Sequence, residues 1–171
     1  RKQLDAIGEH YCSNLVPDAK ATIAALQSLG KSVGIVSGGL LIPVQQVARH
    51  LEVPLEHVHA VPLLFHDDGS YQDFDHNSPL WRNGGKVPIV QGAPEAHHPM
   101  VFVGDGITDL ETKEHVARFI GFGGVVARDA VLKNADYFVH ENSLAAILPH
   151  VLTAQEVIAL SQDPNFSSLL S

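Results

Sequence analysis

The sequence is poor in cysteine and has no long apolar run. Cys12 is the single cysteine among 171 residues, so the chain can form no internal disulfide. A lone thiol is usually inert, and its isolation fits a reducing compartment, so we expect a cytoplasmic protein. No stretch approaches the roughly 18 apolar residues that a membrane-spanning helix needs, and we therefore expect no membrane partner.

Positive charge is also scarce. The chain has 11 Lys and Arg against 19 Asp and Glu, which gives a formal net charge of −8. Nucleic acids and anionic membranes attract basic patches, so neither is an expected partner of a chain without one. A phosphorylated metabolite could bind such an acidic protein only where a metal ion or a placed lysine supplies local positive charge.

Short apolar segments alternate with amphipathic ones, which predicts an α/β fold with a Rossmann-like parallel sheet and helices on both faces. A small β-hairpin is expected at residues 63–74, with Asp68-Gly69 as its turn. No linker marks a second domain. We expect strands at 33–36, 58–60, 100–104, 118–124 and 136–140, and helices at 1–12, 41–51, 110–116, 143–149 and 153–162, with another that opens at Pro17-Asp18 and stops at Gly30.

The first polar cluster is Ser37-Gly38-Gly39, which we expect to break the strand at 33–36 before the next helix. A hydroxyl and exposed backbone N–H groups beside a helix N-terminus suit a phosphate oxygen. The same residues would also serve as a plain turn from strand to helix, and the cluster alone does not decide between these interpretations.

The second cluster is Gly84-Gly85-Lys86. Its glycines let the backbone approach a ligand, and Lys86 could place one compact cation on a phosphate. The preceding residues do not supply the first glycine of a Walker loop at the required spacing. An ordinary exposed surface lysine is the alternative.

The third cluster follows the most apolar strand, in the stretch V-G-D-G-I-T-D-L at residues 103–110. Asp109 stands where a dinucleotide fingerprint has its third glycine, and an acid there would repel pyrophosphate. Asp105 and Asp109 would suit Mg²⁺, which takes one or two carboxylates and a substrate phosphate. A helix N-cap, with Thr108 or Asp105 capping, is the alternative.

In this order the clusters resemble the second, third and fourth motifs of the haloacid dehalogenase superfamily of phosphatases. L-V-P-D-A-K-A-T-I-A-A-L-Q, H-D-D-G-S-Y-Q-D-F-D and R-F-I-G-F-G-G are similar to the phosphoserine phosphatase branch, in its animal-like form. The resemblance covers roughly residues 15–150. It implies a Mg²⁺-dependent hydrolase that acts on a small phosphorylated metabolite, namely phosphoserine, and that acts in serine biosynthesis.

The resemblance also implies a role for each cluster. Ser37, Gly38 and Gly39 would hold the phosphate, and Lys86 would neutralise charge on the nucleophile and the phosphoryl group. Asp105 would bind Mg²⁺. The remaining two assignments are Asp109, which would orient Lys86 or a metal-bound water, and Thr108, which would contact substrate or phosphate.

The superfamily's first motif, D-x-D-x-[TSV], does not occur in this chain. That motif carries the nucleophilic aspartate, and its nearest counterpart here, Asp73-Phe74-Asp75, is interpreted as a solvated turn in the hairpin. We therefore divide the chain into a residual end of a helical cap at 1–14, a core without its first strand at 15–152, and a C-terminal helix and tail at 153–171.

Without the first strand, backbone groups of the neighbouring strands would be buried and unpaired. Each such group costs about 1–3 kcal/mol, and several together exceed the margin of about 5–15 kcal/mol that a domain has. We expect residues 1–171 alone to fold poorly and to be inactive, with a missing N-terminal segment or a homodimer partner as the alternatives. A phosphatase for another small phosphomonoester and a non-catalytic phosphate-binding fragment stay open as alternative functions.

Overall fold

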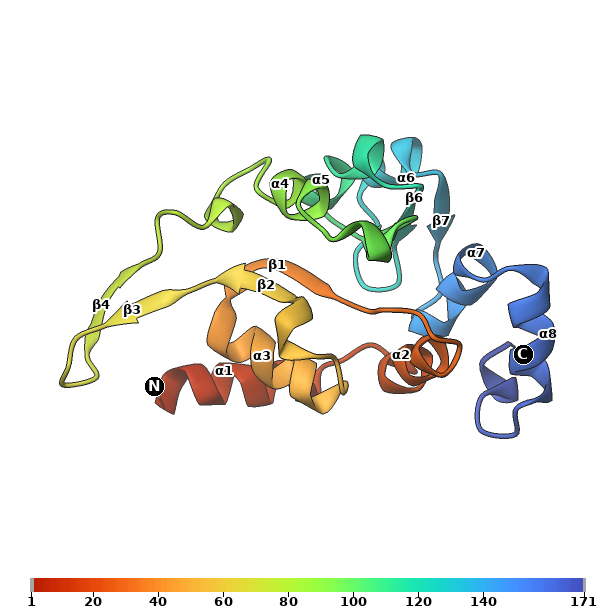
Figure 1. Ribbon diagram of the computed structural model, residues 1–171, viewed down its shortest axis with the longest axis horizontal. Coiled ribbons are helices and arrows are strands. Elements are labelled where there is room, and N and C mark those ends of the chain that lie inside the picture. Colours follow the sequence, from red (N-terminus) through yellow and green to blue (C-terminus); the bar gives the residue numbers. More distant parts are fainter. Residues whose placement is uncertain (1, 171) are drawn as a thin grey trace. The chain divides into compact units, whose positions relative to one another are not determined.

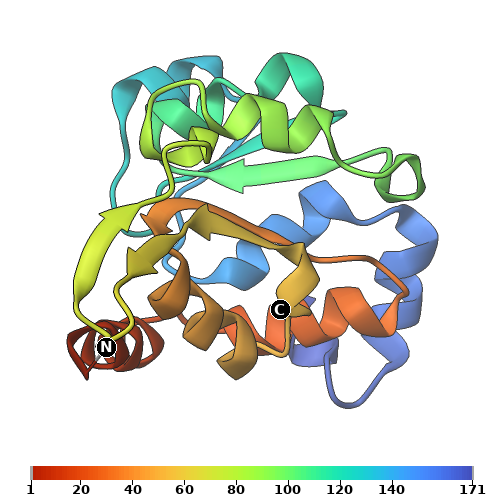
Figure 2. The same ribbon diagram turned by 60° about the vertical axis from the view of Figure 1, so that its left-hand side comes forward.

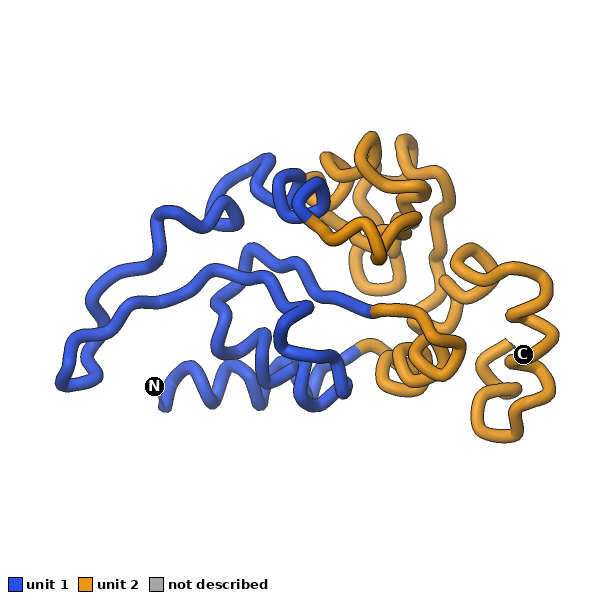
Figure 3. The backbone as a smooth tube through the Cα atoms, in the orientation of Figure 1, with its two compact units in different colours: residues 1–15, 33–92 blue, residues 16–32, 93–171 orange. Residues whose placement is uncertain are grey.

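The chain forms two compact units, each built from two separate segments (Figure 3). The computed structural model describes residues 2–170. Unit 1 consists of residues 1–15 and 33–92, and unit 2 of residues 16–32 and 93–171. Because the chain passes from one unit to the other and back, no single linker separates them, and the sequence shows no boundary. Within residues 2–170, no helix is both long and apolar enough to cross a membrane.

Unit 1 is organised around a parallel β-α-β arrangement (Figure 1). Strand β1 (Ile35–Leu40) pairs in parallel with β2 (Val58–Val61), and α3 (Leu41–His50) connects them. A 3-10 turn, Leu55–His57, leads into β2. Helix α3 turns its apolar stripe inward, as its spacing predicts, and buries Pro43, Val44 and Ala48.

Helix α1 (Lys2–Ser13) packs against α3 in the same unit. Gly8 is buried at their contact, and a Cβ there would lie 1.9 Å from Oε1 of Gln46. The Gln46 amide in turn donates to the Asp5 carboxylate at 2.9 Å. The predicted amphipathic helix at the N-terminus is therefore confirmed, and glycine lets it approach α3 closely.

The expected break of the first strand at residues 37–39 is wrong. Strand β1 continues through Ser37, Gly38 and Gly39, and α3 begins directly after Leu40. Val36 pairs with His59 and Leu40 with Val61, so four steps along β1 match two steps along β2. Gly38 and Gly39 tolerate such an irregularity because they have no side chain to clash. The strand is therefore distorted at these two glycines but does not end there.

The predicted β-hairpin is confirmed in unit 1, with β3 (Leu63–Phe65) antiparallel to β4 (Tyr71–Phe74). Gly69 takes a positive φ of 81° at the turn, and the Asp68 carboxylate accepts a hydrogen bond from the Ser70 amide at 2.8 Å. At the base of the hairpin, aromatic rings of Phe74, His76 and Trp81 contact one another, with the Phe74 and Trp81 ring centroids 5.7 Å apart.

Unit 2 contains a three-stranded parallel sheet in the order β5-β6-β7 (green to blue in Figure 2). The strands are β5 (Val101–Gly104), β6 (Arg118–Phe122) and β7 (Tyr137–Val139), all three predicted from their apolar runs. One cluster of buried side chains joins the sheet to the segment after it, and its members are Ile120, Phe122, Val139 and Ile147.

The connections in unit 2 differ from the expected ones. In place of a helix at 110–116, the structure has α5 (Ile107–Leu110) and a 3-10 turn (Lys113–His115). The helix starts earlier because the Asp109 carboxylate accepts the Gly106 N–H at 2.9 Å and so stabilises the first turn. Helix α6 (Asp129–Asn134), between β6 and β7, is short and was not predicted.

Helices from both ends of the sequence meet in unit 2. Helix α2 (Ala19–Ser28) ends before Gly30, which has a φ of 77°, as predicted. The end of the chain forms a 3-10 turn (Leu144–Ile147), α7 (Leu148–Val151), α8 (Ala154–Gln162) and another 3-10 turn (Ser167–Leu170).

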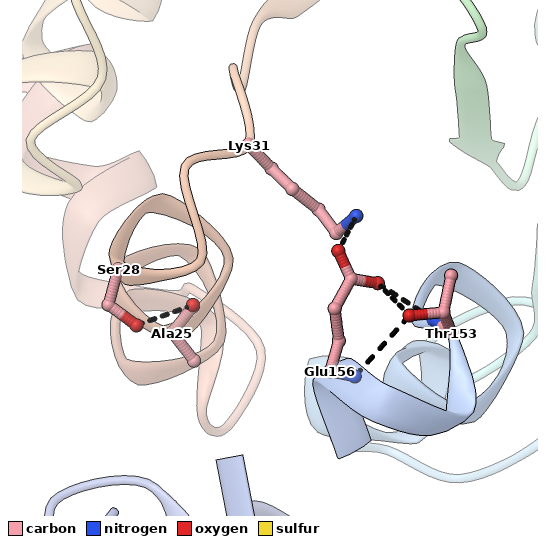
Figure 4. Close-up of polar contacts among 5 residues, drawn as sticks. All are labelled: Ala25, Ser28, Lys31, Thr153 and Glu156. Carbon is pink, nitrogen blue, oxygen red and sulfur yellow. Dashed lines mark hydrogen bonds and ion pairs between the residues drawn. The ribbon is translucent and has the colours of Figure 1, made fainter. Parts of the chain in front are cut away.

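An ion pair ties the α2 segment to α8. The Lys31 ammonium lies 2.7 Å from Oε1 of Glu156 (Figure 4). The other carboxylate oxygen of Glu156 accepts from the backbone N–H of Thr153, also at 2.7 Å, in a capping box at the start of α8. One carboxylate therefore both caps α8 and fixes it to the earlier segment.

Candidate functional site

The residues expected at the site are divided between the two units. Unit 1 carries Ser37, Gly38, Gly39 and Lys86, while unit 2 carries Asp105, Thr108 and Asp109.

The glycines after Ser37 keep the backbone of unit 1 accessible at the end of β1. Gly38 is exposed, and the Ser37 hydroxyl accepts a hydrogen bond from the Gly39 N–H at 3.0 Å. The N-terminus of the ten-residue helix α3 follows at Leu41. A hydroxyl, exposed backbone and a helix N-terminus thus come together, which is the combination that suits an anionic oxygen.

Lys86 is the first residue of α4 (Lys86–Gln91). It follows Gly84, whose φ of 75° requires glycine, and the buried Gly85. A Cβ at Gly85 would lie 1.9 Å from the carbonyl oxygen of Pro79, in the 3-10 turn Pro79–Trp81. The glycine pair therefore lets α4 lie close to that turn, and α4 also contacts β1, which carries residues 37–39.

Asp109 is the buried acid of unit 2, with 7% of its surface exposed. Its carboxylate lies over the end of β5, and a Cβ at Gly104 would be 2.3 Å from Cγ of Asp109. The carboxylate accepts the Gly106 N–H, and the hydroxyl of the fully buried Thr112 donates to the Asp109 carbonyl at 2.7 Å. These contacts give the capping role at the start of α5 to Asp109, whereas the sequence-based alternative to metal binding assigned capping to Thr108 or Asp105.

Asp105 differs from Asp109 in its exposure and in its partner. Its side chain is 47% exposed and forms an ion pair with the guanidinium of Arg128. Nη1 of Arg128 donates both to Oδ2 of Asp105 and, at 2.9 Å, to its main-chain carbonyl oxygen. Arg128 was not predicted from the sequence, although it follows the I-G-F-G-G segment by only a few residues and is a cation near the end of a strand.

Thr108 lies between the two acids on α5 and is half-buried. Its Oγ1 turns back toward Gly106, where a Cβ would be 3.7 Å away. The turn of Gly106, Thr108 and Asp109 is thus compact, and it directly follows the strand that ends at Gly104.

A hollow of about 450 Å³ opens beside Asp105 in unit 2. Apart from Asp105, its lining is apolar or glycine, and consists of Val16, Val103, Gly104, Phe122, Val125 and Leu144. The single carboxylate at an apolar wall is the charged group that a ligand in this hollow would meet.

The donor set for magnesium is partial. Within residues 2–170, no group of three or more His, Cys, Asp or Glu side chains could hold a metal ion. Magnesium requires only one or two protein carboxylates beside water and substrate oxygens, and the half-exposed Asp105 fits as one of them. The described residues therefore fit the ion through Asp105, with Arg128 as a neighbouring positive charge.

Contrary to the prediction from the sequence, the D-x-D spacing does not lie wholly in a turn, because Asp73 belongs to β4 and pairs with Leu64 of β3, while Asp75 follows the end of the strand. The Asp73 carboxylate accepts the Phe74 N–H at 2.8 Å and lies 3.1 Å from Nε2 of His76. The Phe74 amide, followed by His76, lowers the pKa of Asp73 below its ordinary value. The Asp75 carboxylate accepts the Asn77 N–H at 2.9 Å, so both carboxylates are engaged by groups at the end of β4 and in the turn that follows it.

Comparison with known proteins agrees with this architecture. No protein-family model matches the chain. Phosphoserine phosphatase of Bos taurus is 34% identical over 141 residues, which are 81% of this chain and 63% of the relative. The enzyme of Drosophila melanogaster is 37% identical over 130 residues, 74% of this chain and 48% of the relative.

The fold has solved counterparts as well. A phosphoserine phosphohydrolase-like protein from Francisella tularensis superposes with a TM-score of 0.75 at 24% identity, over 89% of this chain and 70% of that one. This match, together with the helices and parallel strands of both units, confirms the Rossmann-like α/β fold. The sequence similarity to phosphoserine phosphatases confirms the resemblance to phosphatases of the haloacid dehalogenase superfamily. In sequence the chain is similar to phosphoserine phosphatases, and it spans less than two thirds of the length of the curated relatives named above.

Proposed function

We propose that the protein is a Mg²⁺-dependent phosphomonoester hydrolase that releases L-serine and phosphate from phosphoserine. The observation that carries this proposal is the homology to curated phosphoserine phosphatases over about four fifths of the chain, 81% in the bovine comparison. The order of the hydroxyl, lysine and carboxylate clusters along the chain supports the same chemistry, because phosphoryl transfer requires positive charge and donors around the phosphate.

In unit 1, the proposed contribution is to hold the phosphoryl group. The Ser37 hydroxyl and the exposed backbone at Gly38 would hold phosphate oxygens, and the Gly39 N–H, which donates to the Ser37 hydroxyl, would keep that hydroxyl in place. Lys86 would stabilise the charge that develops on the phosphoryl group and the nucleophile. Its place at the start of α4, which contacts β1, supports this assignment.

In unit 2, Asp105 would supply one oxygen ligand to Mg²⁺, which would stabilise negative charge on the phosphate when bound. Asp109 would act through position, because its carboxylate orders the turn after β5 and could orient Lys86 or a water. Thr108, on the same turn, would contact substrate or phosphate.

The proposed reaction has two steps. An aspartate carboxylate attacks phosphorus and the serine oxygen leaves, and water then hydrolyses the aspartyl-phosphate. That aspartate belongs to the D-x-D-x-[TSV] motif, which residues 1–171 do not contain. We also propose that residues 1–14 are the end of a cap, that 15–152 are the catalytic core, and that the polypeptide carrying the nucleophile completes the site.

The deciding experiment measures phosphate release from L-phosphoserine by the full-length protein, with Mg²⁺ and with EDTA. We expect Mg²⁺-dependent release, and a panel of other small phosphomonoesters gives the matched comparison. Faster turnover of another substrate would move the proposal to a different phosphomonoester. No release from phosphoserine with Mg²⁺ present would refute the assignment.

A second candidate is a non-catalytic phosphate-binding protein. The absent D-x-D-x-[TSV] motif favours it, because the remaining clusters can bind phosphate without a nucleophile. Mg²⁺-dependent binding of phosphoserine by the 171-residue chain, measured by calorimetry and without turnover, is the result that this function predicts.

A further inference from the structure

The negative charge of the Asp105 carboxylate is paired with a positive charge of the same chain, that of Arg128. The Arg128 guanidinium contacts Oδ2 and the main-chain oxygen of Asp105, so one nitrogen bridges two oxygens of the same residue. The carboxylate therefore has one oxygen engaged by a cation, and its second oxygen accepts no hydrogen bond from residues 2–170.

The position of Arg128 allows its side chain to move away from Asp105. It precedes the first residue of α6, and its side chain is 44% exposed. The segment before it is anchored at Gly124, where a Cβ would lie 2.4 Å from the Glu141 carbonyl oxygen, whereas Val125 and Val126 are exposed. A fixed glycine followed by exposed residues lets the arginine side chain reorient without moving the sheet.

We propose that Arg128 is the positioning counter-ion of Asp105, and that a divalent cation binds Asp105 in exchange for it. This inference rests on the proposed function, since that function places Mg²⁺ on Asp105. Two positive groups on one carboxylate repel each other, so the guanidinium opposes cation binding until it moves away. In the cation-free protein the same contact fixes the Asp105 carboxylate and prevents an unpaired charge beside the apolar hollow.

The test is a Mg²⁺ titration by calorimetry on the full-length protein, with no substrate present. Arg128→Gln should bind Mg²⁺ more tightly, by about tenfold, because the competing charge is gone. Arg128→Met is a second variant that removes the charge, and its Mg²⁺ affinity should rise in the same way. The Mg²⁺ affinity of Arg128→Lys should stay within about threefold of wild type, because lysine keeps the charge.

Lys133→Gln is the matched control. Lys133 lies on α6, the helix that follows Arg128, and pairs with Asp129 at 3.7 Å on an exposed surface, so its removal deletes one positive charge without touching Asp105. Its Mg²⁺ affinity should equal that of wild type. If Lys133→Gln gained Mg²⁺ affinity to the same extent, the effect would come from the net charge alone, and the proposal would be overturned.

Unchanged or weaker Mg²⁺ binding in both Arg128→Gln and Arg128→Met would also overturn it, as would a wild-type protein that binds no Mg²⁺. The proposed function fails separately. If the variants bind Mg²⁺ as expected while the protein does not hydrolyse phosphoserine, the ion exchange at Asp105 stands and the phosphatase assignment falls.

Discussion

Asp109 packs its carboxylate against Gly104, five residues earlier, so closely that residue 104 has no room for a side chain. A Cβ there would lie 2.3 Å from Cγ and 2.6 Å from Oδ2 of Asp109. The last residue of β5 and the first turn of α5 are therefore one packed arrangement.

Gly104→Ala should disrupt this arrangement. The added methyl group must displace the Asp109 carboxylate, and we expect a loss of about 1–3 kcal/mol in unfolding free energy. Asp109→Asn is the comparison, since it keeps the volume and can still accept the Gly106 N–H. Denaturant unfolding of the purified proteins measures both. A Gly104→Ala protein as stable as wild type would contradict the close packing.

Lys86→Ala should lower kcat on phosphoserine by about 10²–10³-fold, because one preorganised positive charge is removed from the phosphoryl group. Lys133→Ala removes an exposed lysine elsewhere and should have no such effect. Steady-state kinetics on phosphoserine measure kcat for both variants. A Lys86→Ala protein with wild-type kcat would show that this lysine is only a surface residue.

The Lys31–Glu156 ion pair should hold α8 to the α2 segment. Both side chains are about one quarter exposed, at 28% and 25%, so the pair is partly protected from solvent. We expect Lys31→Met to reduce the unfolding free energy by about 0.5–1 kcal/mol, and a double-mutant cycle with Glu156→Gln isolates the pair. An additive cycle would mean that the contact contributes nothing.

The same carboxyl predicts a pH effect. The hydrogen bond from Lys31, followed by that from the Thr153 backbone, holds the pKa of Glu156 below its ordinary value of 4.5. Its contribution to stability is therefore present above about pH 4.5 and is lost as pH falls through the lower pKa of the folded protein. The difference in Tm between wild type and Glu156→Gln should narrow below pH 4.5, and a constant difference down to pH 3 would argue against this linkage.

Residues 1–171 alone should form a poorly stable protein. In the described residues β5 pairs only with β6, and β1 only with β2, so each apolar strand has an edge without a strand partner. Such edges associate with other chains. We expect aggregation or a broad unfolding transition by light scattering and circular dichroism. A sharp, reversible transition of the monomeric chain would contradict this expectation.

Local signals in the sequence were sufficient for much of the fold. Apolar runs located β5 and β6, helical spacing located α1 and α3, and Asp68-Gly69 located the hairpin turn. Each depends on neighbours a few residues away, which is why the sequence reveals it.

Features set by distant partners were not predictable. Strand β1 passes through Gly38 and Gly39 because β2 pairs with the residues on either side of them. Helix α5 starts at Ile107 because the Asp109 carboxylate folds back on Gly106. The partner of Asp105, Arg128, lies 23 positions further along the chain, and only the folded sheet brings them together.

Trp81 is the single tryptophan of the chain, and it lies in the aromatic cluster at the base of the hairpin in unit 1. Its indole N–H donates to the His76 carbonyl at 3.4 Å, and the Arg82 guanidinium lies 5.9 Å from its ring. Intrinsic fluorescence of the indole therefore reports the local environment of that hairpin. Opening of the β5-β6-β7 sheet needs a separate optical signal, for which the half-exposed Tyr137 on β7 is the natural reporter.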